Sequence, residues 1–200
     1  MNAADCEAQL RCWVEHLVVG EGLCPFAAAP LRAGRVRFAV CEATDDDAIF
    51  RAFLEEVQRL LESDERVLET TLLAVPRALA RFDDYLDMLG HLEQALEELG
   101  LTSELQIASF HPHYRFAGEE EEDPSHYTNR SPCPVFHLLR QSSITQALGR
   151  WEDPEQIPER NRTRMRELGR AAVEALLTEC RKGPSGESPI ADRTPGRRPG

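Results

Sequence analysis

The chain has 200 residues, of which 42% are hydrophobic, 29% charged and 6% aromatic, values that suit a globular protein and exclude collagen-like, coiled-coil and wholly disordered chains. Lys and Arg number 23 against 35 Asp and Glu, so the formal net charge is -12. A chain this acidic gains little from counterion release. The composition therefore argues against nucleic acid and anionic membranes as partners.

The N-terminus is polar and acidic, without the basic and apolar regions of a signal peptide. No stretch reaches the roughly 18–20 apolar residues of a transmembrane helix, so we expect a cytoplasmic protein without a membrane partner. The six cysteines are scattered and form no CxxC pair: Cys6, Cys12, Cys24, Cys41, Cys133 and Cys180. This pattern predicts free thiols and argues against a disulfide framework or a zinc site of the paired-cysteine type.

In chain order, residues 3–19 predict a helix because their apolar side chains recur at helical spacing. Residues 35–43 alternate as a strand does. A capping box of Thr44 and Asp47 then predicts a helix that ends at about Leu61. The first part of the chain therefore places a strand between two amphipathic helices.

Residues 68–75 predict the next strand, residues 82–99 a helix with Gly100 at its C-cap, and residues 105–110 a third strand. Strands that alternate with amphipathic helices favour right-handed crossovers. The pattern therefore predicts an α/β fold with a small, mainly parallel sheet flanked by helices.

The rest of the chain begins with an irregular segment, residues 111–132, which contains an acidic run. A loop of this length is usually functional or disordered. Helices are predicted at about 134–149 and at 158–181. From residue 183 the chain is rich in Pro, Gly and Ser, which predicts a disordered tail. We therefore expect one α/β domain over residues 1–182 and a disordered tail over 183–200.

Several motifs are distinctive in combination. They are Trp13, GLCPFA at 22–27, LQIASFHPHYRFA at 105–117, YTNRSP at 127–132, HLLR at 137–140 and IPERN at 157–161. Together they resemble domain-of-unknown-function family 1415 over roughly residues 5–180. The resemblance implies a soluble protein with one domain, and it implies no reaction. The family pattern Phe-His-Pro-x-Tyr often has Asp at x, where this sequence has His113.

His111 is the strongest single candidate for a catalytic residue, because it directly follows the third predicted strand. Ligands of open parallel sheets bind at the carboxyl ends of the strands, and Pro112 restricts the backbone at His111. A neutral imidazole at this position could act as a general acid or base near pH 7. The alternative is a histidine that only tethers the loop by hydrogen bonds.

A polar cluster follows His111 in the sequence. Its members are Tyr127, Thr128, Asn129, Arg130, Ser131, His137 and Arg140. Arg130 and Arg140 could clamp a carboxylate or phosphate, Ser131 could lie at the start of the next helix, and His137 would share a helical face with Arg140. Alternatively, these groups pin the acidic loop. The arginines of residues 160–166 are expected to meet internal acids, among them the acidic loop 119–123.

Two further hypotheses concern a nucleophile at Cys24 and a metal site at His111 and His113. Cys24, followed by Pro25, could be a nucleophile whose pKa is lowered by a helix N-terminus, although burial in the core is the more common fate of a free cysteine. His111 and His113 could bind zinc or iron in an extended chain, completed by His126, Cys133 or His137.

The sequence thus predicts an enzyme or ligand-binding domain that acts on a small anionic molecule. His111 would be the acid or base, Arg130 and Arg140 the clamps, and Asn129 and His137 their support. The alternatives are a metal-binding protein that uses His111 and His113, and a non-catalytic interaction module. The sequence identifies no cofactor.

Overall fold

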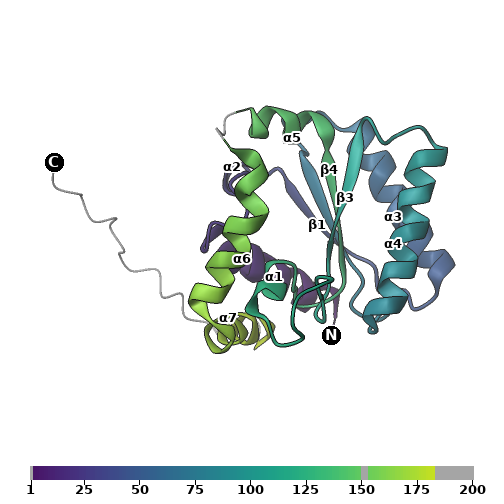
Figure 1. The fold of residues 1–200 in the computed structure, drawn as a ribbon. Helices are drawn as coiled ribbons and strands as arrows, with labels where there is room; N and C mark the ends of the chain where they lie inside the picture. Colours follow the sequence, from purple (N-terminus) through teal and green to yellow (C-terminus); the bar gives the residue numbers. More distant parts are fainter. Residues whose placement is uncertain (1, 150–152, 183–200) are drawn as a thin grey trace.

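The computed structural model of the chain describes residues 2–149 and 153–182. The described residues form a four-stranded sheet between two layers of helices (Figure 1), so the α/β class is confirmed. The predicted disordered tail lies outside the described residues.

The N-terminal helix has two parts with different hydrogen bonding. Helix α1 spans Ala3–Trp13, with the Asn2 side chain accepting a hydrogen bond from the Asp5 backbone N–H at 2.8 Å. The segment η1, Val14–Val19, continues it as a π-helix. The sequence predicted one uniform helix here, because apolar spacing does not distinguish the two types of turn.

A short helix that the sequence did not predict, α2 (Ala28–Arg32), comes next. The strands and helices that follow it lie close to their predicted places. They are β1 (Val36–Val40), α3 (Asp46–Glu62), β2 (Thr70–Ala74), α4 (Phe82–Glu98) and β3 (Leu105–Phe110). The N-cap of α3 is Asp45, whose carboxylate accepts from the Ala48 backbone N–H at 2.9 Å. The predicted cap at Thr44 was therefore one residue early.

The prediction of one helix over residues 134–149 was wrong. The run Val135–Arg140 is strand β4, and only Gln141–Leu148 is a helix, α5. Strand β4 lies between β2 and β3, where both of its faces are covered, so apolar residues stand at neighbouring positions, Val135 beside Phe136 and Leu138 beside Leu139. Such a run does not show the alternation that separates a strand from a helix.

The position of β4 also changes the type of sheet. The strand order is β1-β2-β4-β3, with β1 parallel to β2, and β4 antiparallel to both β2 and β3. The sheet is therefore mixed, and the prediction of a mainly parallel sheet was wrong. Phe110 pairs with Val135 and Leu105 pairs with Arg140, so His111 and Arg140 lie at opposite ends of the sheet.

Two hydrophobic cores form, one on each face of the sheet. Helices α3 and α4 cover one face, and α1, η1 and the C-terminal helices cover the other (Figure 1). The predicted helix 158–181 is divided at Gly169 into α6 (Ile157–Leu168) and α7 (Arg170–Lys182). Gly169 has φ 75°, which a residue with a Cβ adopts only with strain.

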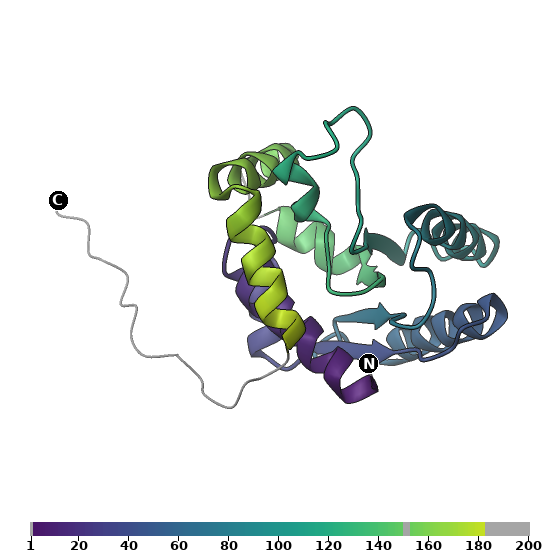
Figure 2. The same ribbon diagram turned by 90° about the horizontal axis from the view of Figure 1, so that it is seen from below.

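Helix α7 lies alongside α1 (Figure 2), and a disulfide between Cys12 and Cys180 joins the two helices. The prediction that these two cysteines are free thiols was wrong, because the sequence does not reveal that segments 168 residues apart become neighbours. Among the described residues, the cysteines that remain free are Cys6, Cys24, Cys41 and Cys133.

Candidate functional site

His111 is fully buried, and both of its ring nitrogens are engaged in hydrogen bonds. Nδ1 accepts from the backbone N–H of His113 at 3.0 Å, which leaves the ring proton on Nε2, and Nε2 donates to the Leu79 carbonyl at 2.9 Å. Burial lowers the pKa of His111, so the ring is kept neutral. The geometry matches the tethering role that was the alternative to catalysis.

The predicted metal site at His111 and His113 gains no support from this arrangement. A metal ligand needs a free lone pair, and the hydrogen bond from the His113 backbone already uses the one on His111. His113 itself is exposed. His126 is held in the same way: its Nδ1 accepts from the Phe116 N–H at 3.1 Å and its Nε2 donates to the Glu120 carbonyl at 2.9 Å.

The polar cluster after His111 fastens the loop to the sheet. The side-chain amide of Asn129 donates to the Ser109 backbone carbonyl at 3.0 Å. The backbone carbonyl of Asn129 accepts from the His111 backbone N–H at 3.1 Å. The buried Ser131 hydroxyl donates to the Cys133 carbonyl at 2.6 Å. Ser131 precedes a strand, so the helix N-terminus that the sequence predicted for it does not exist.

Arg130 and Tyr127 are also held by neighbours within the protein. The Arg130 guanidinium lies 4.5 Å from the centre of the Tyr127 ring and donates to the Tyr114 carbonyl at 3.2 Å. The Tyr127 hydroxyl donates to Glu174 at 2.6 Å. These contacts stabilise the loop against α7, and they use groups that the anion hypothesis required.

The acidic loop is pinned by arginines from the C-terminal helices. Arg166 pairs with Glu119 at 2.7 Å and with Asp123 at 3.1 Å, and Arg170 pairs with Glu122. The prediction that the arginines of residues 160–166 meet internal acids of this loop is confirmed for Arg166.

Arg140 lies at the far end of the sheet and caps helix α3. Its guanidinium donates to the carbonyls of Leu60, Ser63 (2.7 Å) and Leu68 (3.2 Å). Along a strand, residues 137 and 140 point to opposite faces, so the shared helical face of His137 and Arg140 was a consequence of the wrong element. His111, Arg130 and Arg140 therefore do not converge on one anion.

A different group of residues surrounds a cavity of about 280 Å³ on the face of the sheet that α1 and η1 cover. Most of its lining is apolar. The lining includes Trp13, Val14, Val18, Cys24, Phe26, Pro30, Val36, Thr70, Leu72, Ala108, Phe110, His137, Leu139 and Ile144. Three sequence candidates border this cavity, namely Cys24, His137 and Arg140.

His137 presents a polar atom to the cavity. The Thr70 hydroxyl donates to the Leu138 carbonyl at 2.6 Å, so His137 Nε2 must donate to the Thr70 oxygen, 2.7 Å away. Nδ1 is then an acceptor, and no described residue donates to it. Burial lowers the pKa of His137 to about 4, so its ring is neutral at pH 7.

Cys24 contributes a protonated thiol. Backbone hydrogen bonds from Phe26 and Ala27 favour the thiolate, but burial outweighs them and raises the pKa of Cys24. Helix α2 begins only at Ala28, so Cys24 is not a helix N-cap. The lowered pKa that a nucleophilic role requires is therefore not found.

Trp13 also borders the cavity, although its sequence context predicts only that it belongs to a motif. Its side chain is 1% exposed, and the indole Nε1–H has no hydrogen-bond partner among the described residues. A buried donor without a partner costs about 1–3 kcal/mol. Trp13 lies where α1 passes into the π-helix η1, and such segments occur often at functional sites. Neither the orphan donor nor the π-helix could be read from apolar spacing.

The fold and the cavity define an α/β protein with an apolar pocket between its sheet and its N-terminal helix. The model of the family described as "Protein of unknown function (DUF1415)" matches residues 5–175, and the chain belongs to that family. No curated protein and no solved structure matches the chain. Among the described residues, no helix is long and apolar enough to cross a membrane.

Proposed function

We propose that the protein binds a small, mostly apolar and uncharged molecule in the cavity beside Trp13. The observation that carries the proposal is the apolar cavity that Trp13 lines, together with the buried indole N–H of this residue, which has no partner among the described residues. Buried donors are almost always satisfied, so a ligand with an acceptor group would supply what the protein lacks.

Two polar residues of the lining, His137 and Arg140, define the ligand further. His137 Nδ1 can accept a hydrogen bond, so a group that both donates and accepts, such as a hydroxyl, would suit Trp13 and His137 together. The guanidinium of Arg140 is engaged with the end of α3, and His137 is neutral at pH 7. Among the described residues that line the cavity, no cation is left free, which favours an uncharged ligand over the anion that the sequence suggested.

The size of the cavity limits the ligand. At about 280 Å³ it lies just below the range of small-molecule pockets, which runs from about 300 to about 1,000 Å³. A molecule with one ring and a short chain would fit. The apolar lining provides the binding free energy through burial, and the polar atoms fix the orientation.

Two isosteric probes test the proposal: 4-phenylbutan-2-ol, which carries a hydroxyl, and isopentylbenzene, which carries a methyl group in its place. Thermal unfolding and the fluorescence of Trp13, followed in a Trp151→Phe chain, report binding. We expect the alcohol to bind about 5- to 10-fold more tightly than the hydrocarbon, as one net hydrogen bond predicts.

Two variants complete the experiment. Trp13→Phe, followed by thermal unfolding alone, should remove the preference for the alcohol, and Ala108→Leu should weaken both probes because it fills the cavity. The proposal is wrong if neither probe stabilises the wild type, or if Ala108→Leu binds both unchanged. The anion 4-phenylbutyrate is the third probe, and tighter binding of this carboxylate than of the alcohol would overturn the uncharged ligand.

A further inference from the structure

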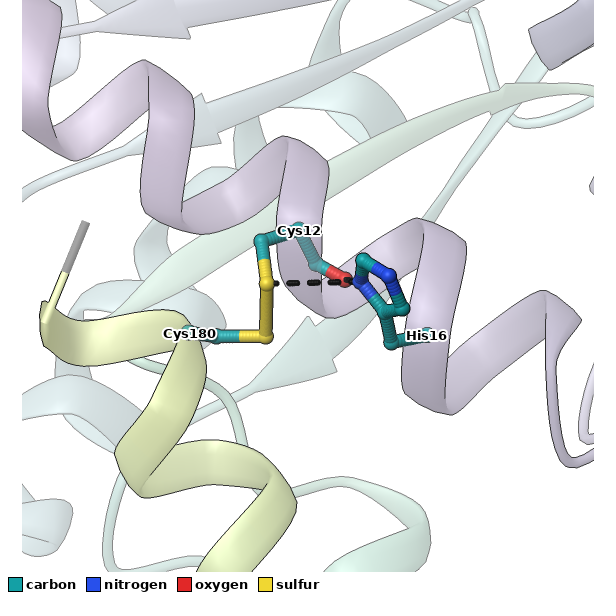
Figure 3. Close-up of side chains that lie close together, drawn as sticks. All are labelled: Cys12, His16 and Cys180. Atoms are coloured by element: carbon teal, nitrogen blue, oxygen red, sulfur yellow. Dashed lines mark hydrogen bonds between the residues drawn. A yellow bond between two sulfur atoms is a disulfide. The ribbon is translucent and has the colours of Figure 1, made fainter. Parts of the chain in front are cut away.

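A cluster of soft metal ligands lies between the N-terminal helix and α7, and none of its residues lines the cavity. It consists of Cys12, His16 and Cys180 (Figure 3). One donor atom from each residue lies within 4.8 Å of the other two. We propose that, when the disulfide is reduced, these three side chains bind one Zn²⁺ ion.

The donor set suits zinc. Two thiolates and one imidazole are ligands that zinc prefers, and the absence of carboxylates disfavours calcium and magnesium. Cys12 and His16 are four residues apart on one helix, so they share a face. Cys180 comes from α7, which packs beside α1.

The separation of the donor atoms also suits zinc. His16 Nδ1 lies 3.4 Å from Cys12 Sγ. In a tetrahedral zinc site with Zn–S of about 2.3 Å and Zn–N of about 2.0 Å, this edge measures about 3.5 Å. The imidazole therefore already lies at the separation that a shared zinc ion requires, and its Nδ1 faces the two sulfur atoms (Figure 3).

The chemistry requires a reductant, for which we name a dithiol. The dithiol transfers two electrons and two protons to the bond between Cys12 and Cys180, gives two thiols, and becomes a disulfide itself. Zn²⁺ then replaces the two thiol protons, which leave to solvent. His16 Nδ1 binds as a neutral lone pair, so its ring proton moves to Nε2, away from the Cys12 carbonyl that lies 3.0 Å from Nδ1.

The fourth position would face solvent, because His16 is exposed and Cys12 is half-buried. A water molecule can occupy it, as in zinc sites that have three protein ligands. The same segment also borders the cavity through Trp13, Val14 and Val18. The proposed site therefore exchanges a covalent link between α1 and α7 for a metal-mediated one.

The test uses the full chain without a histidine tag. It is reduced with a phosphine, loaded with Zn²⁺ and dialysed, and the zinc is counted per chain. Cobalt loaded in the same way should give the charge-transfer absorption of a thiolate–cobalt bond. We expect one zinc per reduced chain and none in the oxidised chain.

Two variants and two matched controls identify the ligands. His16→Ala and Cys180→Ser should weaken zinc binding by at least about 100-fold, the upper end of what the loss of an outer-shell partner costs. His91→Ala replaces another exposed helical histidine, and Cys41→Ser another buried cysteine, and both should bind zinc as the wild type does.

The inference is overturned if the reduced wild type retains no zinc, if His16→Ala binds it as tightly as the wild type, or if the two control variants lose it equally. Since His16 is exposed, its replacement gives a clear result even where Cys180→Ser fails to fold.

Discussion

His137 is a neutral histidine in the wall of a cavity, and its protonation would oppose folding. Its pKa is about 4 in the folded protein and 6.5 when unperturbed. Between these pH values the unfolded chain binds a proton at this residue and the folded chain does not. The free energy of unfolding must therefore fall as the pH falls.

The size of this effect can be measured. The contribution of His137 should lower the free energy of unfolding by about 3 kcal/mol at pH 4 relative to pH 7. Urea unfolding of His137→Leu across this range should show a shallower acid-side decline than the wild type. His111, whose pKa is also lowered by burial, contributes in the same direction and should retain part of the slope. An identical pH dependence in wild type and variant would contradict the neutral, enclosed state of His137.

Arg140 illustrates a charged residue with a structural role. It satisfies carbonyls at the C-terminal end of α3 and in the segment that follows. Arg140→Met keeps much of the aliphatic stem and removes these bonds, so it should lower the free energy of unfolding by about 2–3 kcal/mol. The control is Arg66→Ala, because Arg66 is exposed and pairs with Asp64 at the surface. It should change stability by no more than about 1 kcal/mol, and equal losses in chemical denaturation would argue against the cap.

At the scale of elements, the π-helix η1 sets the wall of the cavity and constrains the glycine that follows it. A Cβ on Gly20 would lie 2.2 Å from the backbone carbonyl oxygen of His16. Backbone atoms cannot move aside as a flexible side chain can, so the segment requires glycine here although its φ of -60° is ordinary.

Two glycine replacements separate this steric requirement from helix propensity. Gly20→Ala should destabilise the protein by about 2–3 kcal/mol through overpacking. Gly90→Ala, in the middle of α4 and with open space around the added methyl group, should stabilise it by about 0.5–1 kcal/mol. Thermal unfolding of both variants measures the difference, and a neutral Gly20→Ala would show that η1 is not held as a π-helix.

At the scale of the whole molecule, the disulfide between Cys12 and Cys180 connects residues 168 apart in sequence. It restricts the unfolded chain, because nearly the entire fold lies within the loop that it closes. Its two ends lie on α1 and α7, which pack on the same face of the sheet (Figure 1).

Reduction in the presence of a chelator should lower the free energy of unfolding by about 2–4 kcal/mol. Urea unfolding with and without reductant gives this value. Cys180→Ser, which has no disulfide to lose, is the control and should not respond to the reductant. A wild type whose stability is the same in both conditions would mean that the two cysteines are not linked.

The sequence by itself determined much of this protein. Apolar periodicity, turn residues and caps are local properties, so they placed β1, α3, β2, α4 and β3 within a few residues and indicated the α/β class. The combined motifs identified the family. Charge pattern also indicated that arginines of the C-terminal helix would meet the acidic loop, as Arg166 does.

Only the tertiary structure determines where β4 lies. The position of β4 in turn determines which of the candidate residues lie near one another. Whether VFHLLR is a strand or a helix depends on its neighbours β2 and β3, which are distant in sequence. Once β4 is a strand, His137 faces a cavity, Arg140 reaches α3, and His111 is left at the other end of the sheet. The pairing of Cys12 with Cys180 and the orphan donor of Trp13 likewise depend on how α1 packs. The spacing of apolar residues reports the local secondary structure. It does not report which distant segments pack together, because a residue's volume and polarity do not specify its partner.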